Sequence, residues 1–155
     1  MEYLKVGDQA SDFALPDQDG KIIKLSEQYA RQNLLLVFNI GFAWPHCTNH
    51  MAQLRHDYPK LQALRTEVLV VVPNGPKTIA NYVRSHEIPY LILSDKGSKV
   101  AAQYFQIKKF FSLGTPTVFV VDQTGHIRYT HYSSSFIEEP NNQEPISLLA
   151  TLQIQ

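Results

Sequence analysis

The sequence lacks an excess of charge of either sign and lacks any long apolar run. Its 155 residues carry 14 basic and 14 acidic side chains, with no Lys/Arg cluster, so nothing in the balance favours binding to nucleic acid. The longest apolar runs, residues 34–38 and 68–73, are far too short to span a bilayer. We therefore expect neither a nucleic acid nor a membrane among the partners.

The chain is also poor in cysteine. One cysteine cannot form a disulfide within the chain, which favours a reducing compartment, and the pattern of residues 1–5 does not predict a signal peptide. These two features predict a cytoplasmic protein. A hydrophobic fraction of 44% with 18% charged residues is typical of a globular protein, and the length predicts a single domain over residues 1–155.

Buried strands alternate with helices along the chain. The patterns predict strands at residues 34–40, 67–72, 88–93 and 117–122, with helices after each of the first three. Alternation of this kind predicts an α/β fold with a mostly parallel central sheet and helices on both faces. Two hairpins complete it: an extra N-terminal hairpin within residues 6–25, and an antiparallel edge hairpin formed by residues 117–132.

Three finer predictions concern helices. Ser26 is expected to cap a short helix that reaches Ala30. Pro59 lies inside the apolar stripe of the helix after Cys47 and is expected to kink or split that helix. The polar segment 133–145 is expected to form a loop before a closing helix at residues 146–152.

Cys47 stands where the first buried strand gives way to a helix. Pro45 has a fixed φ suited to a first helical turn, which places Cys47 near the start of the helix. Unpaired backbone N–H groups and the positive end of the helix dipole favour an anion there, which lowers the pKa of a thiol. The segment is therefore predicted to present a reactive thiolate.

Four passages carry a family resemblance: residues 6–20, 34–48, 68–72 and 114–128. They are similar to the peroxiredoxin group, the alkyl hydroperoxide reductase/thiol-specific antioxidant (AhpC/TSA) branch of thioredoxin-like proteins. The resemblance implies a thioredoxin-like fold and a thiol peroxidase without a cofactor. It places the catalytic site at Cys47, with Trp44 beside it and Thr115 and Pro116 facing it, Pro116 in a cis peptide bond.

The resemblance also implies a reaction sequence. Cys47 would reduce a peroxide, or act on a small disulfide substrate, and a peroxide would oxidise it to a sulfenic acid. Because no second cysteine is present, turnover requires an external thiol as reductant, or a Cys47–Cys47 disulfide between the two copies of a homodimer.

The active-site motif departs from the family pattern Pro-x-x-x-Thr/Ser-x-x-Cys. Counting back from Cys47, Trp44 stands in the place of the hydroxyl residue and Ile40 in the place of the proline, while His50 replaces an acidic residue. The family's arginine is missing, and residues 114–116 (Gly-Thr-Pro) instead resemble the cis-proline loop of thioredoxins. In those relatives a first cysteine stands where Trp44 is here. These losses predict a weak peroxidase.

Two other functions remain open. The first is a redox-inactive binding protein whose contact surface consists of the aromatic residues Trp44, Phe42, Phe110 and Phe111, with Cys47 only a small buried hydrophobe.

The second is a metal site at His46, Cys47 and His50, to which His131 would contribute. Solvated histidines at a helix start are the simpler interpretation of His46 and His50.

Overall fold

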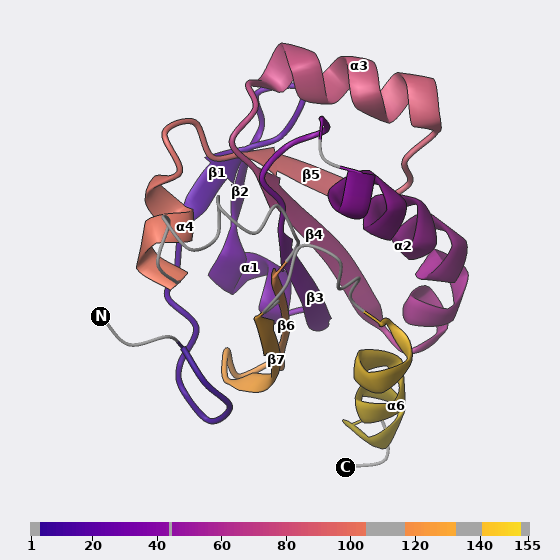
Figure 1. Ribbon diagram of the computed structural model, residues 1–155. Coiled ribbons are helices and arrows are strands. Elements are labelled where there is room, and N and C mark those ends of the chain that lie inside the picture. The colour runs from indigo at the N-terminus through magenta and orange to yellow at the C-terminus, as the bar shows by residue number, and fades with distance from the viewer. Residues whose placement is uncertain (1–3, 44, 105–116, 133–140, 153–155) are drawn as a thin grey trace.

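The computed structural model describes residues 4–43, 45–104, 117–132 and 141–152. For His46 it describes the backbone but not the side chain. Figure 1 shows the course of the chain. In chain order its elements are β1 (Ala14–Pro16), β2 (Ile22–Lys24), α1 (Leu25–Tyr29), β3 (Asn33–Phe38), α2 (Pro45–Ala63), β4 (Thr66–Val72), α3 (Pro76–His86), β5 (Leu91–Ser94), α4 (Lys99–Tyr104), β6 (Thr117–Val121), β7 (Ile127–Tyr132) and α6 (Gln143–Leu152).

A five-stranded sheet in the order β5-β4-β3-β6-β7 forms the centre of the molecule. β3 and β4 pair in parallel, as do β4 and β5, whereas β6 runs antiparallel to β3 and β7 antiparallel to β6. The predicted sheet and its edge hairpin are thereby confirmed. β1 and β2 pair separately as the extra N-terminal hairpin. The carboxyl ends of the three parallel strands meet at one edge, where the cysteine-bearing helix begins.

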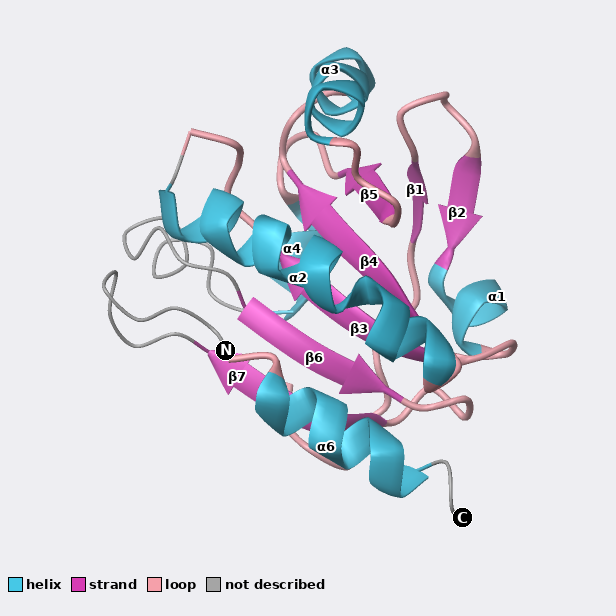
Figure 2. Cartoon of the chain, turned by 90° about the vertical axis from the view of Figure 1, so that its right-hand side faces the viewer, coloured by secondary structure: helices cyan, strands magenta, loops and turns pink. Residues whose placement is uncertain are grey.

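Helices cover both faces of the sheet, and β3 is therefore buried along its whole length. On one face, Met51 and Leu54 of α2 pack with Ile79 of α3 and Leu149 of α6. On the other face, α1, α4 and the N-terminal hairpin build a second cluster, in which Tyr104 packs against strand residues. Figure 2 shows α2 and α6 in front of the sheet, with α4 behind.

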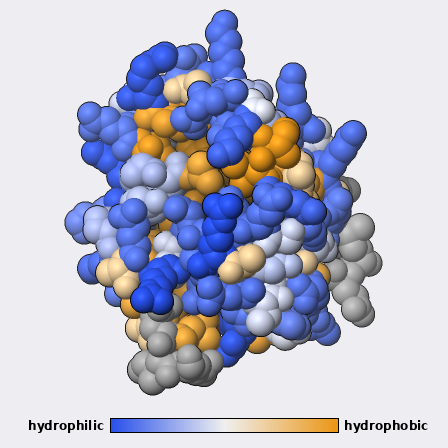
Figure 3. All heavy atoms as spheres, turned by 180° about the vertical axis from the view of Figure 1, so that it is seen from behind, coloured by the Kyte–Doolittle hydropathy of each residue, from blue (hydrophilic) through white to orange (hydrophobic). Residues whose placement is uncertain are grey.

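Hydrophilic side chains dominate the outer surface. Figure 3 shows the face opposite to that of Figure 1, where apolar side chains gather in the upper half among hydrophilic ones. Val6 and Ile22 are the large apolar residues of the described chain that stay exposed, at 59% and 60%. No helix in the described part of the chain combines the length and the apolar character that a membrane span requires.

The structure corrects the prediction for Ser26. Ser26 lies inside α1 and does not cap it. Asp12, fourteen residues earlier, takes that role, because its carboxylate accepts hydrogen bonds from the Ser26 backbone N–H and from the Ser26 hydroxyl. A cap supplied from so far along the chain leaves no local signal in the sequence.

Two further helices also differ from the sequence prediction. α2 runs without a break through Pro59, so the helix is not split. Pro59 is exposed, which lets water bond the backbone carbonyl that the proline leaves without a helical partner. α6 begins at Gln143, three residues earlier than predicted, and Pro145 fits its first turn because the N–H that a proline lacks is unpaired there. The loop predicted from residue 133 lies largely outside the described residues.

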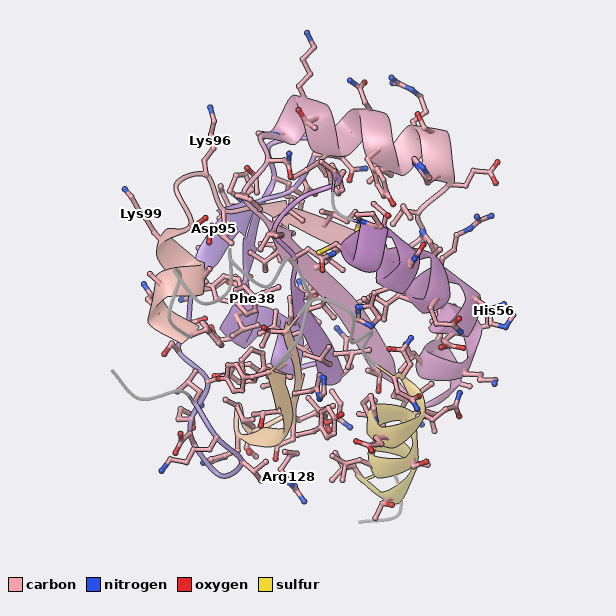
Figure 4. The ribbon with its side chains drawn as sticks, viewed as in Figure 1. Phe38, His56, Asp95, Lys96, Lys99 and Arg128 are labelled. Carbon is pink, nitrogen blue, oxygen red and sulfur yellow. The ribbon has the colours of Figure 1, made fainter. Side chains whose placement is uncertain are left out.

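Asp95 connects the end of β5 to α4. Asp95 is 3% exposed, and its carboxylate accepts hydrogen bonds from the backbone N–H groups of Val100, at 3.1 Å, and Ala101, at 3.0 Å. In Figure 4 Asp95 lies beside Lys96 and Lys99, which extend away from the molecule. Asp95 therefore satisfies N–H groups at the start of α4 that the helix itself cannot pair.

Replacing Asp95 by alanine tests this cap. We expect Asp95→Ala to lower the free energy of unfolding by about 1–2 kcal/mol in urea titrations, because two N–H groups lose their acceptor. The exposed neighbour Lys96 is the control, and Lys96→Ala should change stability by less than about 0.5 kcal/mol. Equal losses in the two variants would contradict the capping role.

Candidate active site

Cys47 lies in the first turn of α2, just beyond the end of β3. Its side chain has no exposed surface and packs in the apolar cluster that includes Phe38 and Ile40. The backbone of Ile40 hydrogen-bonds to the sulfur. The predicted position at a strand-to-helix junction is confirmed, but the sulfur faces inward and not toward solvent.

Burial controls the ionisation of this thiol. It raises the pKa of Cys47 to about 11, and the hydrogen bond from the Ile40 backbone opposes only part of that rise. The prediction of a lowered pKa is therefore wrong for this conformation. The loss of hydration that a thiolate would suffer in the apolar cluster outweighs the favourable helix start.

A stack of aromatic rings connects the turn after β3 with α3. The ring of Phe42 stacks on Tyr82, with centroids 4.1 Å apart, and Tyr82 stacks on His86 at 4.0 Å. Burial, and after it the negative charge of an ionised Cys47, raise the pKa of Tyr82. The Tyr82 phenol is therefore within electrostatic range of the sulfur. No pattern in the sequence places Tyr82 near the thiol.

A buried polar network lies one turn further along α2. His50 Nε2 and Asn142 Oδ1 are 2.9 Å apart, and Asn142 Nδ2 donates to Asp57 Oδ2 at 3.0 Å. Gln53 donates to the same Asp57 oxygen. His50, Asp57 and Asn142 are each no more than 3% exposed, so the interpretation of His50 as a solvated histidine is wrong.

This network joins the helix that carries the cysteine to the segment that starts α6. A cavity of about 450 Å³ lies beside it, and its lining residues are Asn49, His50, Gln53, Asp57, Asn141, Asn142 and Gln143. Asp57 and Asn142 are 85 residues apart, and no sequence pattern relates them.

Asn39 is a second buried polar feature that the sequence patterns do not predict. It is 2% exposed, and within the described part of the chain neither its side-chain nitrogen nor its oxygen has a hydrogen-bond partner. Its backbone N–H donates to the carbonyl of Val71 and so continues the ladder between β3 and β4. An amide inside an otherwise apolar strand is the signal that could have revealed it. The residue after it, Ile40, is the one whose backbone bonds the Cys47 sulfur.

Several predicted site residues lie outside the described residues. These are Trp44, Thr115 and Pro116, with Phe110 and Phe111 of the proposed aromatic surface. Their predicted roles, and the cis bond before Pro116, therefore remain predictions. Phe42, the described member of that surface, is half-buried in its stack with Tyr82.

The metal candidates differ in their surroundings. Cys47 packs in the apolar cluster, whereas His50 hydrogen-bonds to Asn142. No group of three or more His, Cys, Asp or Glu residues suited to a metal ion occurs among the described residues, and the side chain of His46 is not one of them.

Comparison with known proteins shows the family to which this chain belongs. The profile of the AhpC/TSA family matches residues 6–130, most of the chain. The chain belongs to the AhpC/TSA family. A curated relative is the chloroplastic peroxiredoxin Q of Oryza sativa subsp. japonica, 26% identical over 147 residues, which are 94% of this chain and 67% of the relative. Another is the putative peroxiredoxin bcp of Haemophilus influenzae, 33% identical over 104 residues, or 67% of this chain and 66% of that one.

Solved structures show the same fold. Peroxidoxin BcpB from Mycobacterium tuberculosis superimposes with a TM-score of 0.79 at 24% identity, over 98% of each chain. The yeast mitochondrial 1-Cys peroxiredoxin gives a TM-score of 0.83 at 16% identity, over 97% of this chain and 77% of that chain. The protein is thus a peroxiredoxin-like member of the thioredoxin fold, as the residues predict.

The buried network predicts unequal effects for two histidines of α2. We expect His50→Ala to lower the free energy of unfolding by about 1–3 kcal/mol, since it leaves Asn142 Oδ1 buried without its partner. His56 is exposed on the same helix, and His56→Ala should cost less than about 0.5 kcal/mol. Urea denaturation of both variants measures the difference, and similar losses would show that the network is not stabilising.

The raised pKa predicts how alkylation depends on pH. Because only the thiolate reacts, the rate of iodoacetamide addition to Cys47 should rise about tenfold per pH unit from pH 7 to about 10, and level off near pH 11. The extent of alkylation is read from the mass of the intact protein, and circular dichroism at each pH checks that the fold persists. A plateau reached by pH 8 would contradict the buried, protonated thiol.

Proposed function

We propose that the protein is a single-cysteine thiol peroxidase that reduces a peroxide at Cys47. The observation that carries the proposal is the place of this thiol. The chain's one cysteine occupies the first turn of α2, directly after β3, in a member of the AhpC/TSA family. A cysteine kept only for packing has no need of a helix start or of a backbone hydrogen bond to its sulfur.

The reaction proceeds in two stages that balance. The Cys47 thiolate attacks one oxygen of the peroxide; the O–O bond breaks, the sulfur becomes a sulfenic acid, and the other oxygen leaves and is protonated to an alcohol or water. One external thiol then displaces water from the sulfenic acid and forms a mixed disulfide. A second thiol releases the reduced enzyme and leaves as the disulfide of the reductant.

The site supplies few groups for this chemistry. With a pKa of about 11, only about one Cys47 in ten thousand is ionised at pH 7. The Ile40 backbone stabilises the thiolate through its hydrogen bond to the sulfur. We therefore expect slow turnover at neutral pH, with a rate that follows the thiolate fraction.

The burial of Cys47 also bears on the reductant. A disulfide between two copies of the chain would require both sulfurs to leave their apolar clusters, since the Cys47 side chain has no exposed surface. A small external thiol needs a smaller opening, and we infer that it is the reductant. A thiol-rich, reducing compartment such as the cytoplasm fits this requirement.

Removing the sulfur tests the proposal. With dithiothreitol as reductant, the wild-type protein should consume hydrogen peroxide catalytically, and Cys47→Ser should consume none above buffer, because a hydroxyl does not attack the O–O bond at a useful rate. Wild-type protein treated with an equivalent of peroxide should also add one dimedone molecule, a tag for sulfenic acid.

The control variant, Met51→Leu, distinguishes oxidation of Cys47 from oxidation of the methionine sulfur in the same helix. Met51 is buried one turn after Cys47 and can gain the same oxygen mass. Met51→Leu, a volume-conserving change, should keep both peroxide consumption and the dimedone adduct. Consumption that persists in Cys47→Ser, or wild-type protein that forms no adduct and consumes no peroxide, would refute the peroxidase assignment.

A further inference from the structure

A second cavity lies at the opposite end of the sheet from the thiol. Its volume is about 430 Å³, within the range of small-molecule sites. We call it the arginine pocket. Its lining residues are Arg31, Asn33, Arg65, Asp122, Gln123, Thr124, Arg128 and Leu152.

The arginine pocket is separate from the peroxidase site. Asn33 opens β3, whereas Ile40 and Cys47 follow the end of that strand. The seven residue-to-residue steps from Asn33 to Ile40 span about 20 Å in an extended chain. In Figure 4 Arg128 lies at the lower end of the molecule, whereas Figure 1 shows the start of α2 in the upper half, below α3.

Three arginines converge on this cavity from distant parts of the sequence. Arg31 follows α1, Arg65 lies between α2 and β4, and Arg128 belongs to β7. Arg128 pairs with Asp122, at 3.2 Å between Nη1 and Oδ2. Neither Arg31 nor Arg65 has an ion-pair partner in the described part of the chain, although the whole protein has no net charge.

The one carboxylate in the lining is already engaged. Asp122 Oδ1 accepts hydrogen bonds from the Thr124 backbone, the Thr124 hydroxyl and the His126 backbone, and Oδ2 accepts from Arg128. Burial raises the pKa of Asp122, but these hydrogen bonds outweigh it and leave the pKa below its usual value. The ionised carboxylate therefore cancels one of the three positive charges, and two remain.

We propose that the arginine pocket binds the phosphate group of a small phosphorylated molecule. Two uncompensated guanidinium groups match the double negative charge of a phosphate, and each presents a planar fork of N–H donors suited to phosphate oxygens. Asn33 and Gln123, which also line the cavity, carry amide groups that can add neutral donors. The cavity has room for more than the phosphate, and Leu152 gives it an apolar wall.

Calorimetric titration at fixed ionic strength tests the site, with inorganic phosphate, pyrophosphate and adenosine diphosphate as probes. We expect one pyrophosphate per chain. Arg31→Gln and Arg65→Gln should each weaken binding at least about tenfold, because each removes a charge-assisted hydrogen-bond donor. Arg65 has a positive φ of 52°, and glutamine resembles arginine in its tolerance of that conformation, so the change isolates the charge.

Arg84→Gln is the matched control. Arg84 is an exposed arginine on α3 outside the pocket, and its loss should leave pyrophosphate affinity unchanged. Cys47→Ser should also bind pyrophosphate normally, which keeps this test independent of the peroxidase assignment. Tighter binding of the nucleotide than of inorganic phosphate would identify a nucleotide as the source of the group, and equal binding would point to free phosphate; both support the site.

Three results would overturn the proposal. The first is no heat of binding with any probe at about 10 mM. The second is an equal loss of affinity in Arg84→Gln and the pocket variants, which would mark non-specific charge attraction. The third is citrate binding as tightly as pyrophosphate, which would show that the pocket does not select phosphate.

Discussion

The burial of the Cys47 sulfur is the constraint on which the rest of the site depends. β3 is buried along its whole length because helices cover both its faces, and a short turn leads from the end of that strand into α2. The first turn of α2 therefore places its thiol in the apolar cluster and not at a polar surface. The helix start and the Ile40 hydrogen bond favour a thiolate, but desolvation has the larger effect on the pKa.

The surroundings of α2 hold that arrangement in place. Met51 and Leu54 fix the helix against the sheet, and the His50–Asn142–Asp57 network ties it to the segment before α6. Where the family pattern has an acidic residue, this chain has a histidine that serves as part of a structural network. The Cys47 side chain has no exposed surface in this arrangement, so burial affects both the hydration of the sulfur and its contact with solvent.

Sequence patterns predicted the parts of this structure that depend on periodicity. Continuous apolar runs gave β3, β4 and β6, and the junction of an apolar run with Pro45 located Cys47 at a helix start. The resemblance to AhpC/TSA proteins, carried by short motifs, is confirmed by the family profile. Such patterns can be recognised in the sequence because the buried face of one strand, or the geometry of one turn, determines which residue types occur there.

Features that depend on packing between distant segments could not be predicted. The pKa of Cys47 depends mainly on how completely the neighbouring elements exclude water from the thiol. The position of a residue at the start of a helix gives no information about that exclusion. The cap that Asp12 provides to α1 and the bond between Asp57 and Asn142 join residues without any sequence spacing in common. The convergence of Arg31, Arg65 and Arg128 at one cavity is invisible for the same reason.

The second-order rate constant for oxidation of Cys47 by hydrogen peroxide, measured from pH 6 to 10, tests the central claim most directly. If a buried thiol of high pKa is the peroxidatic group, the logarithm of the rate constant should rise with a slope of about one per pH unit across this range. A rate constant that is already level at pH 7, or no oxidation at any pH, would contradict the account.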